Sequence, residues 1–203
     1  MPPDKQFGSE DFWANIFDME IIIEPGYRLE LLEGKLVWDQ PPSINHQRIS
    51  HRLQRILEDY FREIDPKGEM FHAPLCILPG SCIQPDLLYI SGEQRDMIRD
   101  THIDGAPNLV AEIISPLTRI KDSLIKHRIY LKAGIQHFWL LDPENRILQC
   151  LSLGKDSYAL VVLGTEDEAV EHPDFAGLSI DLIFAGLSID LRSLWNNGEC
   201  PRY

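Results

Sequence analysis

The run Leu109-Val110-Ala111-Glu112-Ile113-Ile114 decides the fold, because five of its six residues are apolar. A nearly continuous apolar run of this length is typical of a strand that is buried on both faces of a sheet. Glu112 interrupts the run, and a carboxylate is costly to bury unless a cation or hydrogen-bond donors accompany it. The sequence therefore predicts a central strand that carries one buried acid with a charged or polar partner.

Further strands and helices are predicted on both sides of this run. Arg28 to Trp38 alternates and contains Glu33-Gly34, which indicates a hairpin turn. The apolar residues from His46 to Arg62 fall at helical spacing, and a second helix is predicted from Thr118 to Ala133, closed by Gly134. Short strands are expected at residues 75–78, 87–90, 138–141, 147–151 and 158–163. This order predicts an α/β (α+β) fold with a mixed central sheet flanked by helices.

The length of 203 residues is that of one globular domain. We expect a single domain over residues 1–203, in which residues 1–25 form an N-terminal extension with a short helix at Ser9 to Glu20. Phe175 to Leu182 recurs unchanged as Phe184 to Leu191. Two short copies do not make a solenoid, so we interpret residues 175–191 as a local duplication with one copy packed and the other looped out.

Composition limits the function classes. The longest apolar runs are far shorter than the ~20 residues that span a bilayer, and the N-terminus lacks the pattern of a secretion signal, so we expect a cytoplasmic protein without membrane contact. The four cysteines form no Cys-x-x-Cys pair, which disfavours a zinc knuckle and a disulfide framework. The formal charge is −13, but residues 119–132 hold five basic residues and a single acid. A nucleic acid would therefore bind near this basic segment.

Asp86, which follows Pro85 at the start of a predicted strand, and Glu112 form a candidate metal site. Mg²⁺ prefers oxygen ligands and keeps several waters, so these two carboxylates and the backbone carbonyl of Ile113 would suffice. The alternative is that Asp86 caps a turn and that Glu112 pairs with a basic residue. The residues alone leave both interpretations open.

Pro85-Asp86 followed by Glu112-Ile113-Ile114-Ser115-Pro116 resembles the PD-(D/E)XK nuclease superfamily and, within it, the Uma family of proposed restriction endonucleases. The resemblance covers most of the chain, from Leu29–Gly34 to the Gly-Leu-Ser-Ile-Asp-Leu ending, and includes His46, Asp122, Lys126, Tyr130, Gly134, Trp139 and Asp142-Pro143. It implies a restriction-endonuclease-like core, Mg²⁺ with Mn²⁺ as a substitute, and hydrolysis of DNA phosphodiester bonds. Cutting both strands would suit a homodimer.

The superfamily pattern places a lysine two residues after the glutamate, and this chain has Ile114 there. The resemblance implies that Lys126, on the following helix, replaces it. Lys126 lies four residues after Asp122 and four before Tyr130, so the three share one face of a helix. We expect its amine roughly 2.6 to 3.5 Å from Glu112 or from a water beside it. The alternative is a solvated ion pair with Asp122.

Further candidate residues lie outside the pair of carboxylates and Lys126. Glu30, in the first hairpin, would complete the acidic site or be a surface residue, and His46 would contact phosphate or water or cap its helix. The DNA backbone would be held by Arg119, Lys121, Arg128 and Lys132. Two other functions stay open. Ile114 keeps open a catalytically inactive nuclease fold that binds DNA or a protein, and the acidic run from Glu166 to Asp174 suggests an interaction module, with a solvated face as its alternative.

Overall fold

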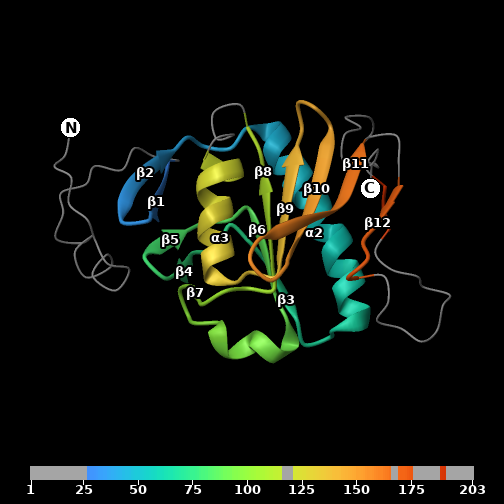
Figure 1. Ribbon diagram of the computed structural model, residues 1–203, viewed down its shortest axis with the longest axis horizontal. Helices are drawn as coiled ribbons and strands as arrows, with labels where there is room; N and C mark the ends of the chain where they lie inside the picture. The colour runs from blue at the N-terminus through green and yellow to red at the C-terminus, as the bar shows by residue number, and fades with distance from the viewer. Residues whose placement is uncertain (1–26, 116–120, 166–168, 176–187, 191–203) are drawn as a thin grey trace, which may run out of the picture.

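The computed structural model describes residues 27–115, 121–165, 169–175 and 188–190. Within them, helices flank a six-stranded sheet of strand order β11-β10-β9-β8-β6-β3, and a five-stranded sheet lies beside it (Figure 1). The helix expected at Ser9 to Glu20 and most of the duplicated segment lie outside these residues. No described helix is long and apolar enough to cross a membrane.

The six-stranded sheet carries the fold that the sequence predicts. Its strands are β3 (Glu69–His72), β6 (Leu87–Ile90), β8 (Leu109–Ile113), β9 (His137–Asp142), β10 (Ile147–Leu153) and β11 (Tyr158–Thr165). Strands β8 and β9 are parallel, and the other neighbours are antiparallel. The sheet is therefore mixed, and β8, which contains the apolar run, lies between β6 and β9 as expected for a central strand.

Each face of this sheet packs against a different helix, because successive side chains of a strand point to opposite faces. One cluster joins α2 (Ile44–Ile64) to the strands and includes Ile49, Leu53, Leu57, Leu109, Ala111 and Ile113. The other joins α3 (His127–Ala133) to the strands and includes Val110, Ile114, Ile129 and Tyr130. Glu112 lies between Val110 and Ile114 in the alternation, so its side chain belongs to the α3 face.

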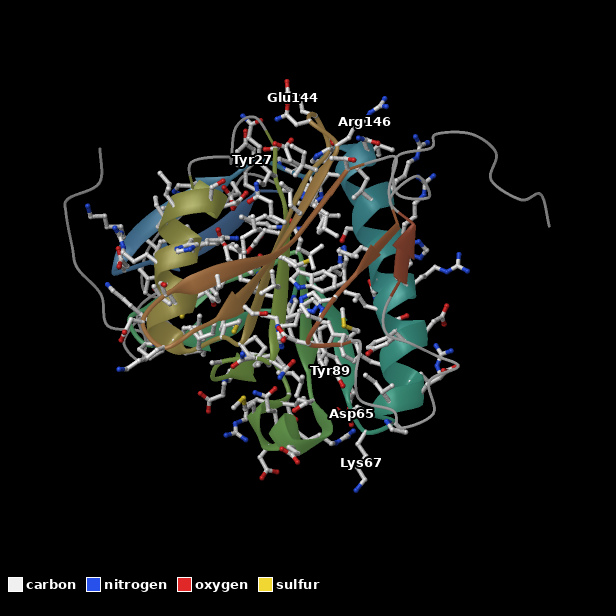
Figure 2. The ribbon with its side chains drawn as sticks, turned by 45° about the vertical axis from the view of Figure 1, so that its right-hand side comes forward. Tyr27, Asp65, Lys67, Tyr89, Glu144 and Arg146 are labelled. Carbon is white, nitrogen blue, oxygen red and sulfur yellow. The ribbon has the colours of Figure 1, made fainter. Side chains whose placement is uncertain are left out.

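Helix α2 is fixed at both ends. At its start the Ser43 hydroxyl accepts a hydrogen bond from the His46 N–H at 3.1 Å, which satisfies one of the unpaired donors of the first turn. At its end the Asp65 carboxylate accepts hydrogen bonds from the Tyr89 hydroxyl (2.6 Å) and the Gly92 N–H (2.7 Å) (Figure 2). These contacts hold the first turn of α2, and with it His46, in a fixed position.

The five-stranded sheet brings in the predicted hairpin. Its strands are β1 (Arg28–Leu32), β2 (Lys35–Asp39), β4 (Cys76–Leu78), β5 (Ser81–Ile83) and β7 (Ile103–Asp104), in the order β2-β1-β5-β4-β7. Glu33 and Gly34 form the turn, both with positive φ (49° and 80°), as hairpins of this length require. The polar excursion from Ser91 to Pro107 contains a 3₁₀ helix, η1 (Gly92–Met97), and β7, neither of which was predicted.

The predicted helix from Thr118 to Ala133 differs in its first part. Residues 118–120 lie outside the described residues, and η2 (Lys121–Lys126) is a π-helix that continues into α3. Gly134 closes the helix in the left-handed conformation, as predicted. Of the C-terminal duplication, Phe175 is buried and Ser188–Asp190 forms β13, which pairs with β12 (Ala169–Glu171).

Candidate functional site

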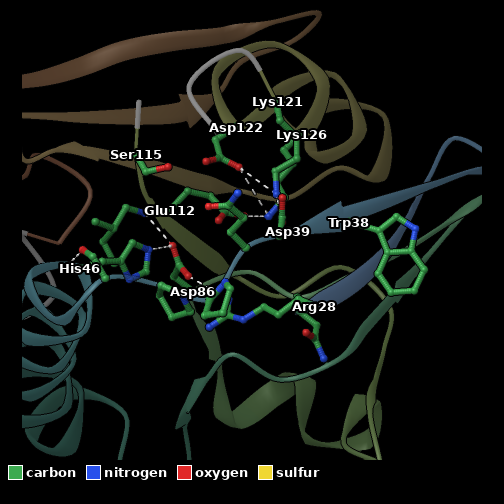
Figure 3. Close-up of a pocket in the computed structure, with 16 residues that line it drawn as sticks. Arg28, Trp38, Asp39, His46, Asp86, Glu112, Ser115, Lys121, Asp122 and Lys126 are labelled. Atoms are coloured by element: carbon green, nitrogen blue, oxygen red, sulfur yellow. Dashed lines mark hydrogen bonds and ion pairs between the residues drawn. The ribbon is translucent and has the colours of Figure 1, made fainter. Parts of the chain in front are cut away.

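The register of β6 and β8 brings together the two carboxylates that the sequence singles out. Leu87 pairs with Ala111 and Leu88 with Val110, so the same register continued by one residue places Asp86 opposite Glu112. Both side chains line a cavity of about 550 Å³ between the two sheets and η2 (Figure 3). They are 6% and 2% exposed, so neither is a surface acid.

Asp86 has a partner on each oxygen. Arg28 Nη1 lies 3.2 Å from Oδ1, and His46 Nε2 lies 3.0 Å from Oδ2, which also accepts the Ile113 N–H at 2.9 Å. Burial opposes ionisation of this carboxyl, but the hydrogen bond and charge of His46, together with Lys126 and the Ile113 N–H, lower its pKa to about 2. Asp86 is therefore an ionised carboxylate at neutral pH. That the Ile113 carbonyl is a metal ligand stays a prediction.

Glu112 contacts Lys126, the residue expected to replace the missing lysine. Lys126 Nζ lies 2.9 Å from Glu112 Oε1, which also accepts a hydrogen bond from the Tyr130 hydroxyl. This distance confirms the expected proximity, although the chemical role of Lys126 stays a prediction. Ile114, at the position where the superfamily pattern has a lysine, is buried among apolar side chains of the α3 face. It is therefore a core residue.

Lys126 is a buried cation among carboxylates. Besides Glu112, its Nζ lies 3.1 Å from Glu30 Oε1 and 3.7 Å from Asp122 Oδ1. Burial alone would lower its pKa, but the surrounding carboxylates raise it well above the usual value. Burial also raises the pKa of Glu112, to about 8, against the opposing charge of Lys126. The predicted alternative, a solvated pair with Asp122, is wrong because the Lys126 side chain is only 2% exposed.

The π-helix explains how two lysines reach one acid. In an α-helix, residues five apart point in different directions, whereas the hydrogen bonds of a π-turn join residue i to i+5 and bring such residues toward one face. Lys121 and Lys126 are five apart, at the two ends of η2, and both contact Glu30. The unusual turn is therefore the local structure that assembles this cluster of charges.

Glu30 enters the site from β1 and is only 1% exposed, so it is not a surface glutamate. Its Oε1 accepts the Gln84 N–H at 2.8 Å, and its Oε2 lies 2.9 Å from Lys121 Nζ. Burial opposes its ionisation, but Lys126 and Lys121 lower its pKa to about 2. Lys121 also contacts Asp39. The expectation that Lys121 holds DNA is not supported by its surroundings, because its ammonium is committed to carboxylates and its side chain is 11% exposed.

The other expected DNA contacts lie farther from the carboxylates. Arg128 and Lys132 both pair with Glu33 in the β1–β2 turn, at 3.0 Å from Arg128 Nε and 2.8 Å from Lys132 Nζ. Their side chains are 55% and 67% exposed, so both remain accessible to a backbone phosphate. Arg119 lies outside the described residues.

Sequence reasoning missed Arg28 and Asp39. The two residues pair with each other at the open end of the β1–β2 hairpin, and Arg28 lies two residues from Glu30 along β1. Residues two apart on a strand point to the same face. Once Glu30 is assigned to the site, the alternation of side chains along the strand places Arg28 on the same face. The pairing of Arg28 with Asp39 in the hairpin then brings Asp39 to the site as well.

The charges of the site fit a divalent cation. Three permanent cations (Arg28, Lys121 and Lys126) lie among five acids (Glu30, Asp39, Asp86, Glu112 and Asp122), which leaves a formal charge of −2 when all five are ionised. Among the described residues Glu112 Oε2 accepts no hydrogen bond, and Asp86 Oδ1 accepts one, from Arg28. Carboxylate oxygens that keep unused lone pairs are the ligands that Mg²⁺ prefers.

Two comparisons with known proteins found a match. The sequence model of the Uma2 family, described as "Putative restriction endonuclease", matches residues 13–183. Among solved structures, one match is the crystal structure of "a putative nuclease belonging to DUF820" from Anabaena variabilis, with a TM-score of 0.69 and 20% sequence identity. The match covers 94% of this chain and 99% of that chain, and at this identity it shows the fold. A search of curated proteins found no match.

Proposed function

This chain belongs to the Uma2 family, and from that premise we propose that it is a metal-dependent endonuclease that hydrolyses DNA phosphodiester bonds. The observation that carries the proposal is the pair Asp86 and Glu112, opposite one another in a cavity whose five acids outnumber its three permanent cations. Asp86, Glu112 and the carbonyl of Ile113 would hold Mg²⁺, with Mn²⁺ as a substitute. A bound divalent cation would supply an acidic water and polarise the phosphate that is cut.

Lys126 supplies the positive charge that the superfamily pattern takes from a lysine two residues after the glutamate, where this chain has Ile114. Its Nζ is held by Glu112, Glu30 and Asp122, so the ammonium is fixed before substrate arrives. A preorganised donor of this kind stabilises negative charge that develops on the phosphate and costs no reorganisation during the reaction. Glu30 acts through Lys126 and Lys121 by holding both ammonium groups, so its role is positioning.

Arg28 and His46 orient Asp86. Each contacts a different oxygen of that carboxylate, and both line the cavity. A carboxylate held on both oxygens is fixed in orientation before a metal binds. Arg28 and His46 are also placed to meet a phosphate that enters the cavity.

DNA would approach over the exposed Arg128 and Lys132, which lie on the last turns of the helix that supplies Lys126. Contacts of this kind position a duplex without reading its sequence. Because the whole chain carries a charge of −13, binding should be weak and sensitive to salt. One metal centre per chain would cut both strands if two copies form a homodimer.

Cleavage of supercoiled plasmid DNA tests the proposal. We expect nicked and linear products with Mg²⁺ or Mn²⁺, none with a chelator, and none from Asp86→Asn in either metal. The matched control is Asp65→Asn, because Asp65 is a hydrogen-bonded carboxylate at the far end of α2. Retention of DNA binding without cleavage by the wild-type protein would instead support the second candidate, an inactive nuclease fold, which Ile114 favours.

A further inference from the structure

A second cluster of metal-ligand side chains lies outside the carboxylate site. It combines His137 at the start of β9 with His172 and Asp174, which follow β12. One potential ligand atom from each of the three lies within 4.8 Å of the other two. His137 Nδ1 is 3.8 Å from Asp174 Oδ2 and 3.2 Å from the Ser152 hydroxyl, which donates to the same Asp174 oxygen. Two imidazoles, a carboxylate and a hydroxyl therefore converge on one point.

His172 carries the observation that points to a ligand. Its side chain is 2% exposed, and its Nε2 is buried without a hydrogen-bond partner among the described residues. Buried polar atoms nearly always have a hydrogen-bond partner, so a buried imidazole nitrogen without one suggests that a ligand occupies this place. The ring is also held in place, since it stacks on Trp139 at a centroid distance of 5.4 Å and packs against Phe175.

This cluster is separate from the carboxylate site. His137 pairs with Leu109, whereas Glu112 pairs with Leu140, so the two sites lie three residues apart along β8, or roughly 10 Å. They also lie on opposite faces of the sheet. His137 alternates with the residues that pack against α2, and Glu112 alternates with those that pack against α3. A cation bound at one site therefore does not occupy the other.

The donors indicate the class of metal. Imidazole suits Zn²⁺ and its neighbours in the first transition row, whereas Mg²⁺ prefers oxygen. Burial lowers the pKa of His137 to about 4 and also lowers that of His172, so both rings are neutral donors at neutral pH. Zinc–nitrogen bonds of about 2.0–2.1 Å require the three ligands to draw together by about 1 Å. Asp174, whose side chain is 42% exposed and lies in the turn that follows β12, is the ligand with room to move.

We propose that His137, His172 and Asp174 bind a divalent transition-metal ion of the zinc class, with Ser152 or water as a further ligand. Coordination by His172 Nε2 places the ring hydrogen on Nδ1, so the 3.2 Å hydrogen bond from the Asp174 N–H is given up in the same step. The ion ties the segment that follows β12 to β9 and β10, and holds Phe175 in the core. It is a structural site, and it does not depend on the proposed nuclease activity.

Calorimetric titration of the full chain with Zn²⁺, in a large excess of Mg²⁺ to occupy the carboxylate site, tests the proposal. We expect one Zn²⁺ per chain and, at one hundred times the dissociation constant, a rise of about 5–10 °C in the melting temperature. Co²⁺ in the same position should show the intense visible absorption of a low-coordinate nitrogen site. The same excess of Mg²⁺ is present with and without Zn²⁺, so stabilisation by Mg²⁺ at the carboxylate site does not enter this shift, and Mg²⁺ should not reduce the Co²⁺ absorption.

Variants decide whether these residues are the ligands. His172→Gln should weaken Zn²⁺ binding by at least about 10- to 100-fold and abolish the thermal shift, and His51→Gln, an exposed histidine on α2, should do neither. If His172→Gln fails to fold, Asp174→Asn gives the same test, because its side chain is 42% exposed and its loss leaves no cavity. Absence of Zn²⁺ binding in the wild type, or undiminished binding in both ligand variants, would overturn the proposal.

Discussion

The two faces of the six-stranded sheet use the same alternation of side chains for opposite purposes. Toward α2, strand β8 presents Leu109, Ala111 and Ile113 to an apolar helix face. Toward α3 it presents Val110, Glu112 and Ile114, and the acid meets a cluster of buried charges on η2 and β1. Burying charge costs free energy that paired apolar groups do not. Both faces bury apolar side chains, but only the α3 face also spends free energy on burying a cluster of charges.

This division gives each face its own response to substitution. A neutral isostere on the α3 face removes charge and preserves shape, so it should change chemistry more than folding. A truncation on the α2 face leaves a cavity and preserves charge, so it should change folding more than chemistry. The predictions below test the division from both sides.

Glu112→Gln and Asp86→Asn should each reduce metal-dependent cleavage at least about a thousandfold, because each removes a carboxyl group that would become a metal ligand worth several kcal/mol. Their stabilities should differ. Gln at position 112 replaces an acid whose pKa burial has already raised to about 8, so the free energy of unfolding should change by less than about 1 kcal/mol. Asn at position 86 leaves Arg28 and His46 without their partner and should cost about 2–3 kcal/mol. Plasmid cleavage and urea unfolding measure both effects.

Leu57→Ala tests the α2 face. Leu57 is fully buried beneath the sheet, so the truncation should lower the free energy of unfolding by about 2–5 kcal/mol. Cleavage per folded molecule should stay within about twofold of wild type at a temperature where the variant remains folded. A large loss of cleavage with little loss of stability would show that the two faces are not independent.

Long periodic patterns made most of this fold predictable. The hairpin with its Glu33-Gly34 turn, helix α2, and strands β6, β8 and β9 were all predicted to within two residues at each end. Strands β3, β5 and β7 were missed because they are short and lack a clear alternation. The π-helix was missed because propensity does not distinguish i+5 from i+4 hydrogen bonds, so one α-helix was predicted instead.

The site divides in the same way. The family motif, together with the replacement of its lysine by Ile114, was enough to find four residues of the site: Asp86, Glu112, Lys126 and Glu30. The structure brings all four to one cavity or its wall. Arg28 and Asp39 depend on strand pairing, which the sequence gives only after the hairpin is accepted. His137 and His172 are 35 residues apart with no spacing rule to join them. They meet because the turn that follows β12 lies against the start of β9, which only the tertiary structure shows.

Lys126→Met should slow cleavage by about 30- to 1000-fold, in line with losing one transition-state donor worth about 2 to 4 kcal/mol. The change removes a positive charge from a cluster that holds a cation, so metal affinity should hold or rise. Calorimetry of Mn²⁺ binding and single-turnover cleavage measure the two quantities. Lys155→Met, an exposed lysine in the turn between β10 and β11, is the matched control. Parallel losses of affinity and rate would mean that Lys126 supports the site only by holding it together.

Glu30 should make stability depend on pH in the acid range. Its pKa is about 2 in the folded protein and about 4.5 in the unfolded chain, so its contribution is fully present above pH 4.5 and is lost as the pH falls toward 2. The difference corresponds to about 3 kcal/mol. Glu30→Gln should be less stable than wild type by about this amount at pH 6, and the gap should close near pH 2. A gap that stays constant with pH would place its cause in packing.

Trp38 gives the smallest expected effect, at the rim where the charged face opens to solvent. Its side chain lines the cavity, yet the residue is 41% exposed, which is unusual for a tryptophan without a partner surface (Figure 3). An exposed aromatic face beside a phosphate site can stack on an unpaired base, and such stacking is worth about 1–3 kcal/mol. Trp38→Ala should therefore raise the KM for single-stranded DNA by about 5- to 100-fold and leave kcat near the wild-type value, because the ring lies away from the carboxylates. Trp38→Phe keeps an aromatic face and should recover most of the affinity. If alanine and phenylalanine behave alike, or if kcat falls instead of KM rising, the ring contributes to the hairpin and not to the substrate.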